Sequence, residues 1–534
     1  MNGNNPLDAI VVGAGFAGLY MLHSLREQGF RVLVIETGSD VGGTWYWNRY
    51  PGARCDIPSI EYSYSFSPEL EREWRWSERY AAQPEILRYL GHVADRFDLR
   101  RDIRFDTRVE AASWDEAVQG WTVRTGGGET LRAHHLILAT GNLSAPKAPD
   151  LPGIDWFRGR VIHTANWPAD IDLAGQRVGI FGTGSSGVQA VPRIAEVAEH
   201  LTVFQRTPSF IVPASNAPLT DADIAAIQPD LPSLREEARG SALGFFQKPI
   251  GQGTAKAASD TERADVFDES WRSGPAGLLS SFGDLLFDEE SNDHAAAYAR
   301  RKIAELIDDP ETARRATPQG FPIGARRLVS EIGYFDALNR DNVELIDVRE
   351  EPVVAVTATG VRTDRREIAL DTLVFATGFH AMTGAAAKID IRGVGGRTLR
   401  EEWADGPRAY LGLGVAGFPN LFLITGPGSP SVLSNVVLSI EQHVEWLTEL
   451  LVDLHERGAT RIEADADAEA EWLHEVDAIA QQTLFPRANS WYHGRTRDGR
   501  TVFMPYVGGV GAYRDRCRRI ADEGYAGFRI SSGE

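Results

Sequence analysis

Cysteine is almost absent from this sequence of 534 residues, which contains only Cys55 and Cys517. Two cysteines so far apart exclude a Cys-x-x-Cys redox pair, a disulfide framework and a metal site built from several thiolates. Such low cysteine usage is typical of a reducing compartment. The first residues also show no secretory signal, so we expect a cytoplasmic protein.

Apolar runs free of helix breakers are missing as well. Residues 410–440 carry no charged side chain, yet they contain several Gly, Pro, Ser and Asn residues. A membrane-spanning segment is a continuous apolar helix, because every backbone polar group needs a partner in lipid. We therefore expect residues 410–440 to form a buried core segment, and we expect no membrane association.

Positive charge is in short supply, since 55 Lys and Arg residues face 75 Asp and Glu residues, for a net charge of −20. This balance argues against a nucleic-acid site that depends on bulk positive charge. Only five of the basic residues are Lys. Any anion that the protein binds should therefore meet an Arg guanidinium, whose planar fork suits phosphate.

One pattern occurs twice in the chain. Residues 7–36 and residues 176–207 each read as a strand, a glycine turn, a helix and a second strand. In this context the turn is the fingerprint of a dinucleotide-binding fold, in which backbone N–H groups at the helix start hold the pyrophosphate. The turn glycines are Gly13, Gly15 and Gly18 in the first copy and Gly182, Gly184 and Gly187 in the second.

The residue that ends each copy distinguishes the two expected ligands. Glu36 ends the first copy, where a carboxylate accepts hydrogen bonds from ribose hydroxyls and repels a 2′-phosphate. The first site therefore suits FAD or NAD. The second copy ends on Arg206 and Thr207, with no acid. Arg206 suits the 2′-phosphate of NADP, and a surface salt bridge is the alternative.

Two short apolar strands, within residues 136–141 and 373–378, close on Ala-Thr-Gly. The interval from glycine turn to Ala-Thr-Gly is longer in the second copy, which indicates an insertion. The sequence thus predicts an α/β fold with two Rossmann-like dinucleotide-binding domains, for FAD and NADP. The expected parts are residues 1–145 and 381–534 for the FAD domain, 146–214 and 319–380 for the NADP domain, and 215–318 for a helical insertion in the NADP domain.

The most specific signal is a string between the two copies, Phe-x-Gly-x-x-x-His-x-x-x-Trp-Pro. Its fixed positions are Phe157, Gly159, His163, Trp167 and Pro168. The string resembles the signature of single-component, FAD- and NADPH-dependent Baeyer–Villiger monooxygenases, and the resemblance covers essentially the whole chain. Residues 426–435 resemble the active-site loop of the phenylacetone and steroid monooxygenase branch of that family.

The resemblance implies that NADPH reduces FAD and that the reduced flavin and O2 form a flavin peroxide. This species inserts one oxygen atom next to a ketone carbonyl, which gives an ester or lactone. Negative charge builds up in the process, so a fixed cation in a dry site should stabilise it. The resemblance places that cation at Arg327 and a supporting carboxylate at Asp56. Arginine suits the role because it stays protonated.

The resemblance also implies a wider set of contacts. Contacts with FAD are implied for Gly13, Gly15, Ala17, Gly18, Glu36, Thr44, Trp45, Tyr46, Trp47, Asp56, Tyr62 and Val109. Contacts with NADP are implied for Arg54, Gly182, Thr183, Gly184, Ser185, Ser186, Gly187, Gln189, Arg206, Thr207, Arg326 and Trp491. The implied substrate pocket contains Ser431, Val432 and Leu433.

Two positions depart from the family pattern, since relatives commonly carry Lys in place of Arg326 and an acid in place of His380. An Arg can still bind a 2′-phosphate, whereas we draw no consequence from His380. His163 is either a proton shuttle or a residue that fixes the domain junction, and we favour the junction. Trp491 belongs either to a mobile loop over NADP or to a packed core.

Two other functions share part of this pattern. A flavin monooxygenase that oxidises nitrogen or sulfur has both nucleotide folds, but Trp167, Pro168 and Arg327 favour Baeyer–Villiger chemistry. A non-catalytic flavoprotein sensor is disfavoured by the intact phosphate turns together with Asp56 and Arg327. We expect a small-molecule ketone and O2 as partners, no metal, no nucleic acid, and a monomer.

Overall fold

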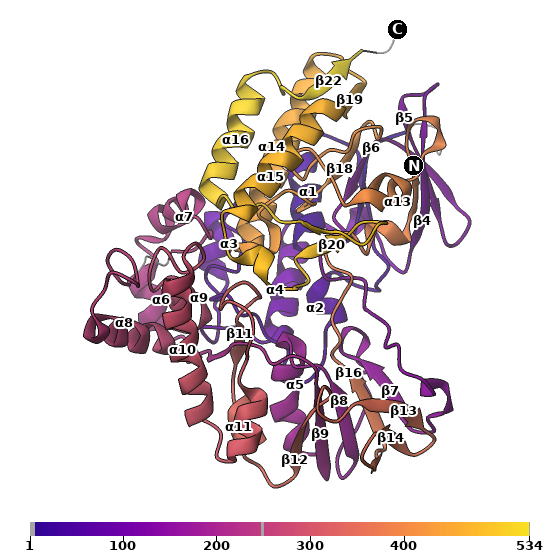
Figure 1. The fold of residues 1–534 in the computed structure, drawn as a ribbon. Helices are drawn as coiled ribbons and strands as arrows, with labels where there is room; N and C mark the ends of the chain where they lie inside the picture. Colours follow the sequence, from indigo (N-terminus) through magenta and orange to yellow (C-terminus); the bar gives the residue numbers. More distant parts are fainter. Residues whose placement is uncertain (1–5, 247–249, 533–534) are drawn as a thin grey trace.

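Two separate sheets organise the chain, and each contains one of the two glycine-turn units (Figure 1). The computed structural model describes residues 6–246 and 250–532. Parallel strands, joined by a helix, form the centre of both sheets. The predicted α/β fold with two Rossmann-like units is therefore confirmed.

The first sheet is built around β1, whose last four residues are fully buried between neighbouring strands. β1 pairs in parallel with β2 and β6, and α1 connects β1 to β2. The strand order is β17-β4-β5-β6-β1-β2-β3, with β18 added beside β6. The elements are β1 (Leu7–Val12), α1 (Phe16–Glu27), β2 (Val32–Ile35), β3 (Ile103–Arg104), β4 (Val109–Asp115), β5 (Gly120–Thr125), β6 (Thr130–Leu138), β17 (Asp390–Arg392) and β18 (Leu421–Leu423).

The C-terminal part of the chain completes this first unit. β17 pairs with β4 and β18 pairs with β6, both in parallel. The uncharged residues 410–440 are almost entirely buried, as the sequence predicts. They lead into α14 (Val436–Glu456), which packs against α1. The other C-terminal elements are α13 (Leu399–Glu402), β19 (Arg461–Ala464), α15 (Ala466–Gln481), β20 (His493–Arg495), β21 (Thr501–Phe503), α16 (Val510–Asp522) and β22 (Phe528–Ser531).

The second sheet is entirely parallel, in the order β12-β9-β8-β16-β7. The second glycine turn joins β8 to α5, and an antiparallel ribbon of three strands, β13 to β15, follows β12 along the chain. The elements are β7 (Arg160–His163), β8 (Arg177–Phe181), α5 (Ser185–Ala195), β9 (His200–Gln205), β12 (Val343–Asp347), β13 (Val353–Thr357), β14 (Gly360–Thr363), β15 (Glu367–Ala369) and β16 (Thr372–Phe375).

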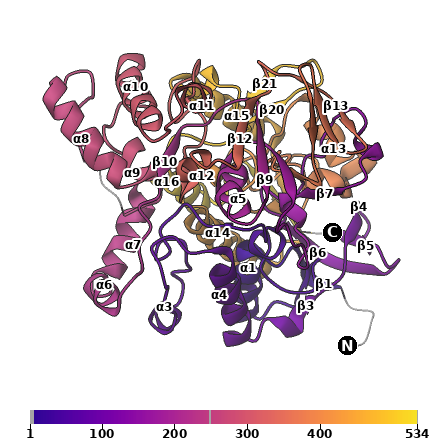
Figure 2. The same ribbon diagram turned by 90° about the horizontal axis from the view of Figure 1, so that it is seen from below.

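Between β10 (Ile211–Pro213) and β11 (Val329–Glu331) the chain forms helices and, over its described residues, no strand. Figure 2 shows α6 to α10 gathered on one side of the molecule, whereas α11 lies nearer to β12 of the second sheet. The longest, α10, begins at Glu289, directly after Asp288, whose side chain caps its first turn. The helices are α6 (Asp221–Ile227), α7 (Leu231–Gly240), α8 (Asp260–Arg272), α9 (Pro275–Leu279), α10 (Glu289–Glu305) and α11 (Pro310–Ala316).

No helix within residues 6–246 and 250–532 combines the length and the apolar character that crossing a bilayer requires.

The third glycine of each turn is required by packing rather than by backbone torsion. A Cβ on Gly187 would lie 2.0 Å from the carbonyl oxygen of Gly182, and one on Gly18 would lie 1.8 Å from that of Gly13. A Cβ on Gly184, in contrast, would meet no atom within 4 Å. Gly187 thus lets α5 start directly against the end of β8, which is the packing role expected of this glycine.

We expect Gly187→Ala to lower the melting temperature of the nucleotide-free protein by a few degrees, which corresponds to about 1–3 kcal/mol of overpacking. Helix propensity alone predicts the opposite sign, a gain of about 1 kcal/mol. Gly184→Ala is the control and should lower the melting temperature less, because its Cβ meets no atom and only the cap residue of α5 changes. Differential scanning calorimetry of both variants measures the shift; an unchanged or raised value for Gly187→Ala contradicts the close contact.

Candidate active site

The first glycine turn presents a helix start and a fixed carboxylate side by side. Gly13, Gly15, Ala17 and Gly18 lie at the carboxyl end of β1 and in the first turn of α1. Glu36 follows β2, and its carboxylate accepts hydrogen bonds of 2.7 Å from the backbone N–H groups of Ala14 and Gly38. These bonds hold the buried carboxylate next to the turn. The arrangement matches a nucleotide site in which ribose binds next to the phosphates.

An aromatic helical turn, α2 (Thr44–Trp47), lies directly against this first turn. A Cβ on Gly43 would lie 2.8 Å from the Cα of Gly15, so the two backbones touch. Trp45 is buried and donates a hydrogen bond of 3.2 Å to the Tyr62 hydroxyl. The other predicted flavin contacts spread around them: Thr44 and Trp47 are exposed, Tyr46 is half-buried, and Val109 is buried at the start of β4.

The second glycine turn is flanked by two arginines without an acidic partner. Among the described residues, no Asp or Glu forms an ion pair with Arg206 or Arg326. The guanidinium of Arg326 lies 4.5 Å from the ring centre of Phe321, and its Nε is buried without a hydrogen-bond partner. Burial and the neighbouring charge of Arg206 lower the pKa of Arg326. Two adjacent cations without a counter-ion form a site for a multiply charged anion.

Arg327 and Asp56 form a bidentate ion pair. The Nε and Nη2 atoms of Arg327 donate to the two carboxylate oxygens of Asp56, at 2.7 Å each, and Nη1 donates to the Val432 carbonyl at 3.0 Å. Burial alone would raise the pKa of Asp56, but the charge and hydrogen bonds of Arg327 lower it. The pKa of Arg327 is raised because Asp56 outweighs the opposing effect of burial. The pair is therefore ionised at any physiological pH.

The pair remains accessible, since 31% of the Arg327 side chain and 21% of the Asp56 side chain are exposed. The predicted pocket loop lies beside it: Ser431, Val432 and Leu433 form a short 3-10 turn whose Val432 carbonyl binds Arg327. Val432 and Leu433 pack in one apolar cluster with Trp491 and Tyr492. The structure thus brings together the predicted catalytic pair, the predicted substrate loop and the neighbourhood of Trp491.

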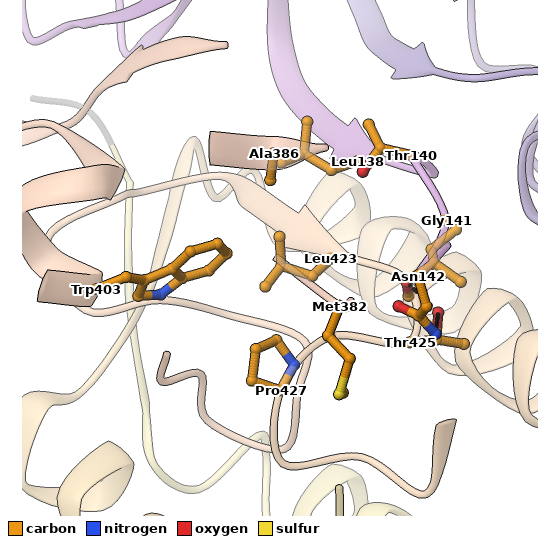
Figure 3. A pocket seen from close by; sticks show the side chains of 12 residues that line it. Leu138, Thr140, Gly141, Asn142, Met382, Ala386, Trp403, Leu423, Thr425 and Pro427 are labelled. Atoms are coloured by element: carbon orange, nitrogen blue, oxygen red, sulfur yellow. Dashed lines mark hydrogen bonds between the residues drawn. The ribbon is translucent and has the colours of Figure 1, made fainter. Parts of the chain in front are cut away.

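Asn142 connects this loop to the end of β6. Its side-chain amide donates to the hydroxyl of Ser431 at 2.6 Å and to that of Thr425 at 3.1 Å. Figure 3 shows Asn142 and Thr425 in a small pocket at the carboxyl ends of β6 and β18. The loop is therefore anchored on the same edge of the first sheet to which the glycine turn belongs.

The motif string follows the edge of the second sheet, where β7 pairs with β16. Gly159 allows close approach to β16, because a Cβ there would lie 2.2 Å from the Asp371 carbonyl oxygen. His163 ends β7; its Nδ1 accepts from the Ala165 N–H at 3.0 Å, and its Nε2 lies 3.3 Å from the Thr377 hydroxyl. Phe157 and Trp167 are half-buried against apolar clusters, and Pro168 is exposed.

His163 touches the segments that connect the two sheets. Thr377 donates a hydrogen bond to the Lys147 carbonyl, and Lys147 donates its N–H to Gly378. Residues 139–159 lead from the first sheet to the second, and residues 376–389 lead back. This geometry supports the junction role predicted for His163, whose pKa is lowered by burial. His380, in the returning segment, is exposed, and its N–H binds Ala145.

Two residues that are predicted to contact NADP form bonds with other groups of the protein instead. The Arg54 guanidinium forms an ion pair of 2.8 Å with Glu78 and donates to the Tyr80 carbonyl. The side-chain amide of Gln189 binds Tyr50 and the backbone of Arg54. The remaining predicted contacts, Thr183, Ser185, Ser186 and Thr207, lie around the second glycine turn and the end of β9.

Three residues beyond the predicted set contribute to this region. Tyr492 is buried beside Arg327, and burial raises its pKa to about 12. Asn142 and Tyr50 hold the pocket loop and the segment before Asp56. Tyr492 directly follows the predicted contact Trp491 in the sequence, whereas no local pattern signals the other two.

Comparison with known proteins agrees with this geometry. The family model for pyridine nucleotide-disulphide oxidoreductases matches residues 10–224. A Baeyer–Villiger monooxygenase of Pseudooceanicola batsensis is 42% identical over 97% of this chain and 95% of that protein. A phenazine N-monooxygenase of Lysobacter antibioticus is 42% identical over 99% of this chain and 98% of that protein.

Solved structures extend the similarity to three dimensions. An oxidised steroid monooxygenase bound to NADP is 51% identical and superimposes with a TM-score of 0.94, covering 99% of this chain and 100% of that one. A closed structure of cyclohexanone monooxygenase is 42% identical, with a TM-score of 0.96 over 99% of this chain and 100% of that one. Full-length similarity at these identities leaves one assignment: the chain belongs to the family of Baeyer–Villiger monooxygenases.

Proposed function

We propose that this protein is an NADPH-dependent Baeyer–Villiger monooxygenase that uses FAD to insert one oxygen atom of O2 next to a ketone carbonyl, giving an ester or lactone. The observation that carries the proposal is the Arg327–Asp56 ion pair beside the pocket loop. Relatives with 38% to 39% identity are named for ketones: cyclohexanone, cyclopentanone and acetone monooxygenases.

The residues present fit both dinucleotides. At the first site the glycine turn, the start of α1 and the Glu36 carboxylate would hold FAD, with the aromatic turn α2 alongside. At the second site the turn at Gly184 is open to a ligand, and the unpaired Arg206 and Arg326 would hold the 2′-phosphate of NADP. Related structures were solved with FAD and NADP, which supports both assignments.

The chemistry supplied by the bound cofactors is NADPH-driven flavin reduction and activation of O2. Arg327 would stabilise the negative charge that develops on oxygen when the ketone is attacked, because a preorganised cation in a dry site acts without reorganisation. Asp56 holds the guanidinium in one orientation and balances its charge. The carbonyl of Val432 fixes the third guanidinium nitrogen. The loop of Ser431, Val432 and Leu433 would border the ketone, and analogy with the branch that carries this loop favours aryl, cyclic or bulky ketones.

Each of the two cofactor-binding units would be assembled from two separate stretches of the sequence. The FAD unit would comprise residues 1–145 and 381–534, which the pairing of β17 and β18 with the first sheet supports. The NADP unit would comprise residues 146–214 and 319–380, with residues 215–318 inserted. The motif residues would hold the junction of the two units. A monomeric, cytoplasmic protein stays a prediction.

N-oxygenation is the second candidate, because one relative with 42% identity is named as a phenazine N-monooxygenase. The two reactions differ in their charge requirement: attack on a ketone produces an oxyanion that needs Arg327, whereas oxygen transfer to a neutral nitrogen does not. Assays of the same preparation with ketones and with aromatic amines or phenazines therefore distinguish them by product mass.

We predict that Arg326→Gln lowers kcat/KM for NADPH by about 10- to 100-fold, the loss expected for one charge-assisted bond of about 1.5–3 kcal/mol. The value for NADH should change far less, since NADH lacks the 2′-phosphate. Steady-state kinetics with both nucleotides provides the measurement. Arg340→Gln, which removes an exposed cation at the opposite end of the same sheet, is the control. Equal losses with NADPH and NADH would rule out the 2′-phosphate role.

For Arg327→Ala we predict retained FAD and retained NADPH-driven flavin reduction, with ester formation at least about 10²–10³-fold slower. Flavin absorbance under anaerobic conditions and product analysis by mass spectrometry measure the two steps separately. Arg177→Ala is the matched control, because Arg177 forms a bidentate pair of the same geometry with Asp371 at the other end of the second sheet. Full ester yield from Arg327→Ala would overturn the proposed function.

A further inference from the structure

A loop of the first unit is bound to the helix of the second by one side-chain amide. The Oε1 atom of Gln189, on α5, accepts a hydrogen bond from the Tyr50 hydroxyl at 2.8 Å and a second from the Arg54 N–H at 3.3 Å. Its Nε2 donates to the Arg54 carbonyl at 3.1 Å. Gln189 therefore pairs with the backbone of Arg54 as a neighbouring strand would, and both ends of its amide are used.

Packing makes this contact close and specific. Tyr50 and Ala53 are 8% and 5% exposed, and both belong to the hydrophobic core of the second unit, together with Val188. A Cβ on Gly52 would lie 2.2 Å from the backbone carbonyl oxygen of Gln189, and Gly52 has a φ of +83°. Only glycine lets the loop come this near to α5. Residues 50–53, which belong in sequence to the first unit, thus pack into the hydrophobic core of the second unit.

The contact lies on a short path between the second glycine turn and the catalytic pair. Gln189 is one helical turn after Ser185, the first residue of α5. At the other end, Asp56 is two residues after Arg54 and holds Arg327 in two hydrogen bonds.

We propose that Tyr50 and Gln189 form an interdomain latch that positions the Asp56–Arg327 pair relative to bound NADP. The proposal rests on the proposed function and changes one part of it: Gln189 acts as a positioning residue rather than as a nucleotide contact. Misplacement of a catalytic group by about 1 Å can cost 10²-fold in rate. A loosened latch should therefore let NADPH be oxidised without delivering oxygen to the ketone.

The test uses the full-length, FAD-loaded protein with Gln189→Met, Tyr50→Phe and the double variant. In each single variant we expect the yield of ester per NADPH consumed to fall at least threefold, while KM for NADPH changes less than twofold. The ester yield per NADPH of the double variant should equal that of the more impaired single variant, because both changes break the same contact. Tyr50→Phe keeps the ring in the core, so it also serves if Gln189→Met fails to fold.

Hydrogen exchange gives a readout that needs no ketone. The peptide that contains Arg54 should exchange at least tenfold faster in Gln189→Met, since the acceptor of the Arg54 N–H is removed. Tyr334→Phe is the matched control and should change nothing: Tyr334 is a buried tyrosine of the same unit whose hydroxyl has no partner among the described residues.

A raised KM for NADPH with unchanged ester yield and unchanged exchange would overturn the latch and make Gln189 a nucleotide contact. Wild-type-like coupling and exchange in both single variants would overturn it as well. If the wild-type protein oxygenates no ketone, the proposed function fails, and the exchange experiment still decides whether the latch exists.

Discussion

The ion pair between Arg327 and Asp56 joins distant segments of the chain and fixes the cation of the proposed active site. Its two members are 271 residues apart in sequence, and Val432, which binds the same guanidinium, is a further 105 residues along. Charges in a largely enclosed position require a partner with good geometry, because desolvation otherwise costs several kcal/mol per ion. The pair and the Val432 carbonyl therefore hold three distant segments together. The result is a guanidinium in a fixed orientation, which the proposed chemistry needs.

The same principle explains how an acidic protein can hold two polyanionic ligands. The net charge of −20 is a sum over the whole chain, whereas the phosphate sites use local features: backbone N–H groups at the starts of α1 and α5. At the second site Arg206 and Arg326 add positive charge that no described carboxylate neutralises. Arg327 is also a cation, but Asp56 fully occupies two of its nitrogens. Arg326 and Arg327 are adjacent in sequence, but only Arg327 has an acidic partner. Arg326 is therefore suited to bind a phosphate, and Arg327 to present a fixed cation.

The sequence predicts the features that depend on neighbouring residues alone. Both glycine turns, the strands that precede them and the acidic end of the first copy follow from short-range patterns, and the structure confirms the two Rossmann-like units. The motif resemblance supplied Arg327 and Asp56, which no local pattern would have joined, and the structure brings their side chains together.

The sequence alone does not predict the contacts between distant segments. The bonds of Asn142 to Ser431 and of Tyr50 to Gln189 join ordinary polar residues 289 and 139 positions apart, with no charge or spacing to signal them. The first half of β6, residues 130–135, alternates between polar and apolar side chains and was not included in the predicted strand at 136–141. It pairs in an antiparallel ribbon with β5, while the apolar half lies between β1 and β18.

The central claim is that the site formed by these units delivers oxygen from O2 to a ketone at the expense of NADPH. Turnover of a panel of aryl and cyclic ketones under ¹⁸O2, with product mass and NADPH consumption recorded together, tests it most directly. The account predicts an ester or lactone that contains one ¹⁸O atom, formed with one NADPH consumed per molecule of product. NADPH consumption that yields only hydrogen peroxide with every ketone, or oxygen transfer to amines alone, would contradict it.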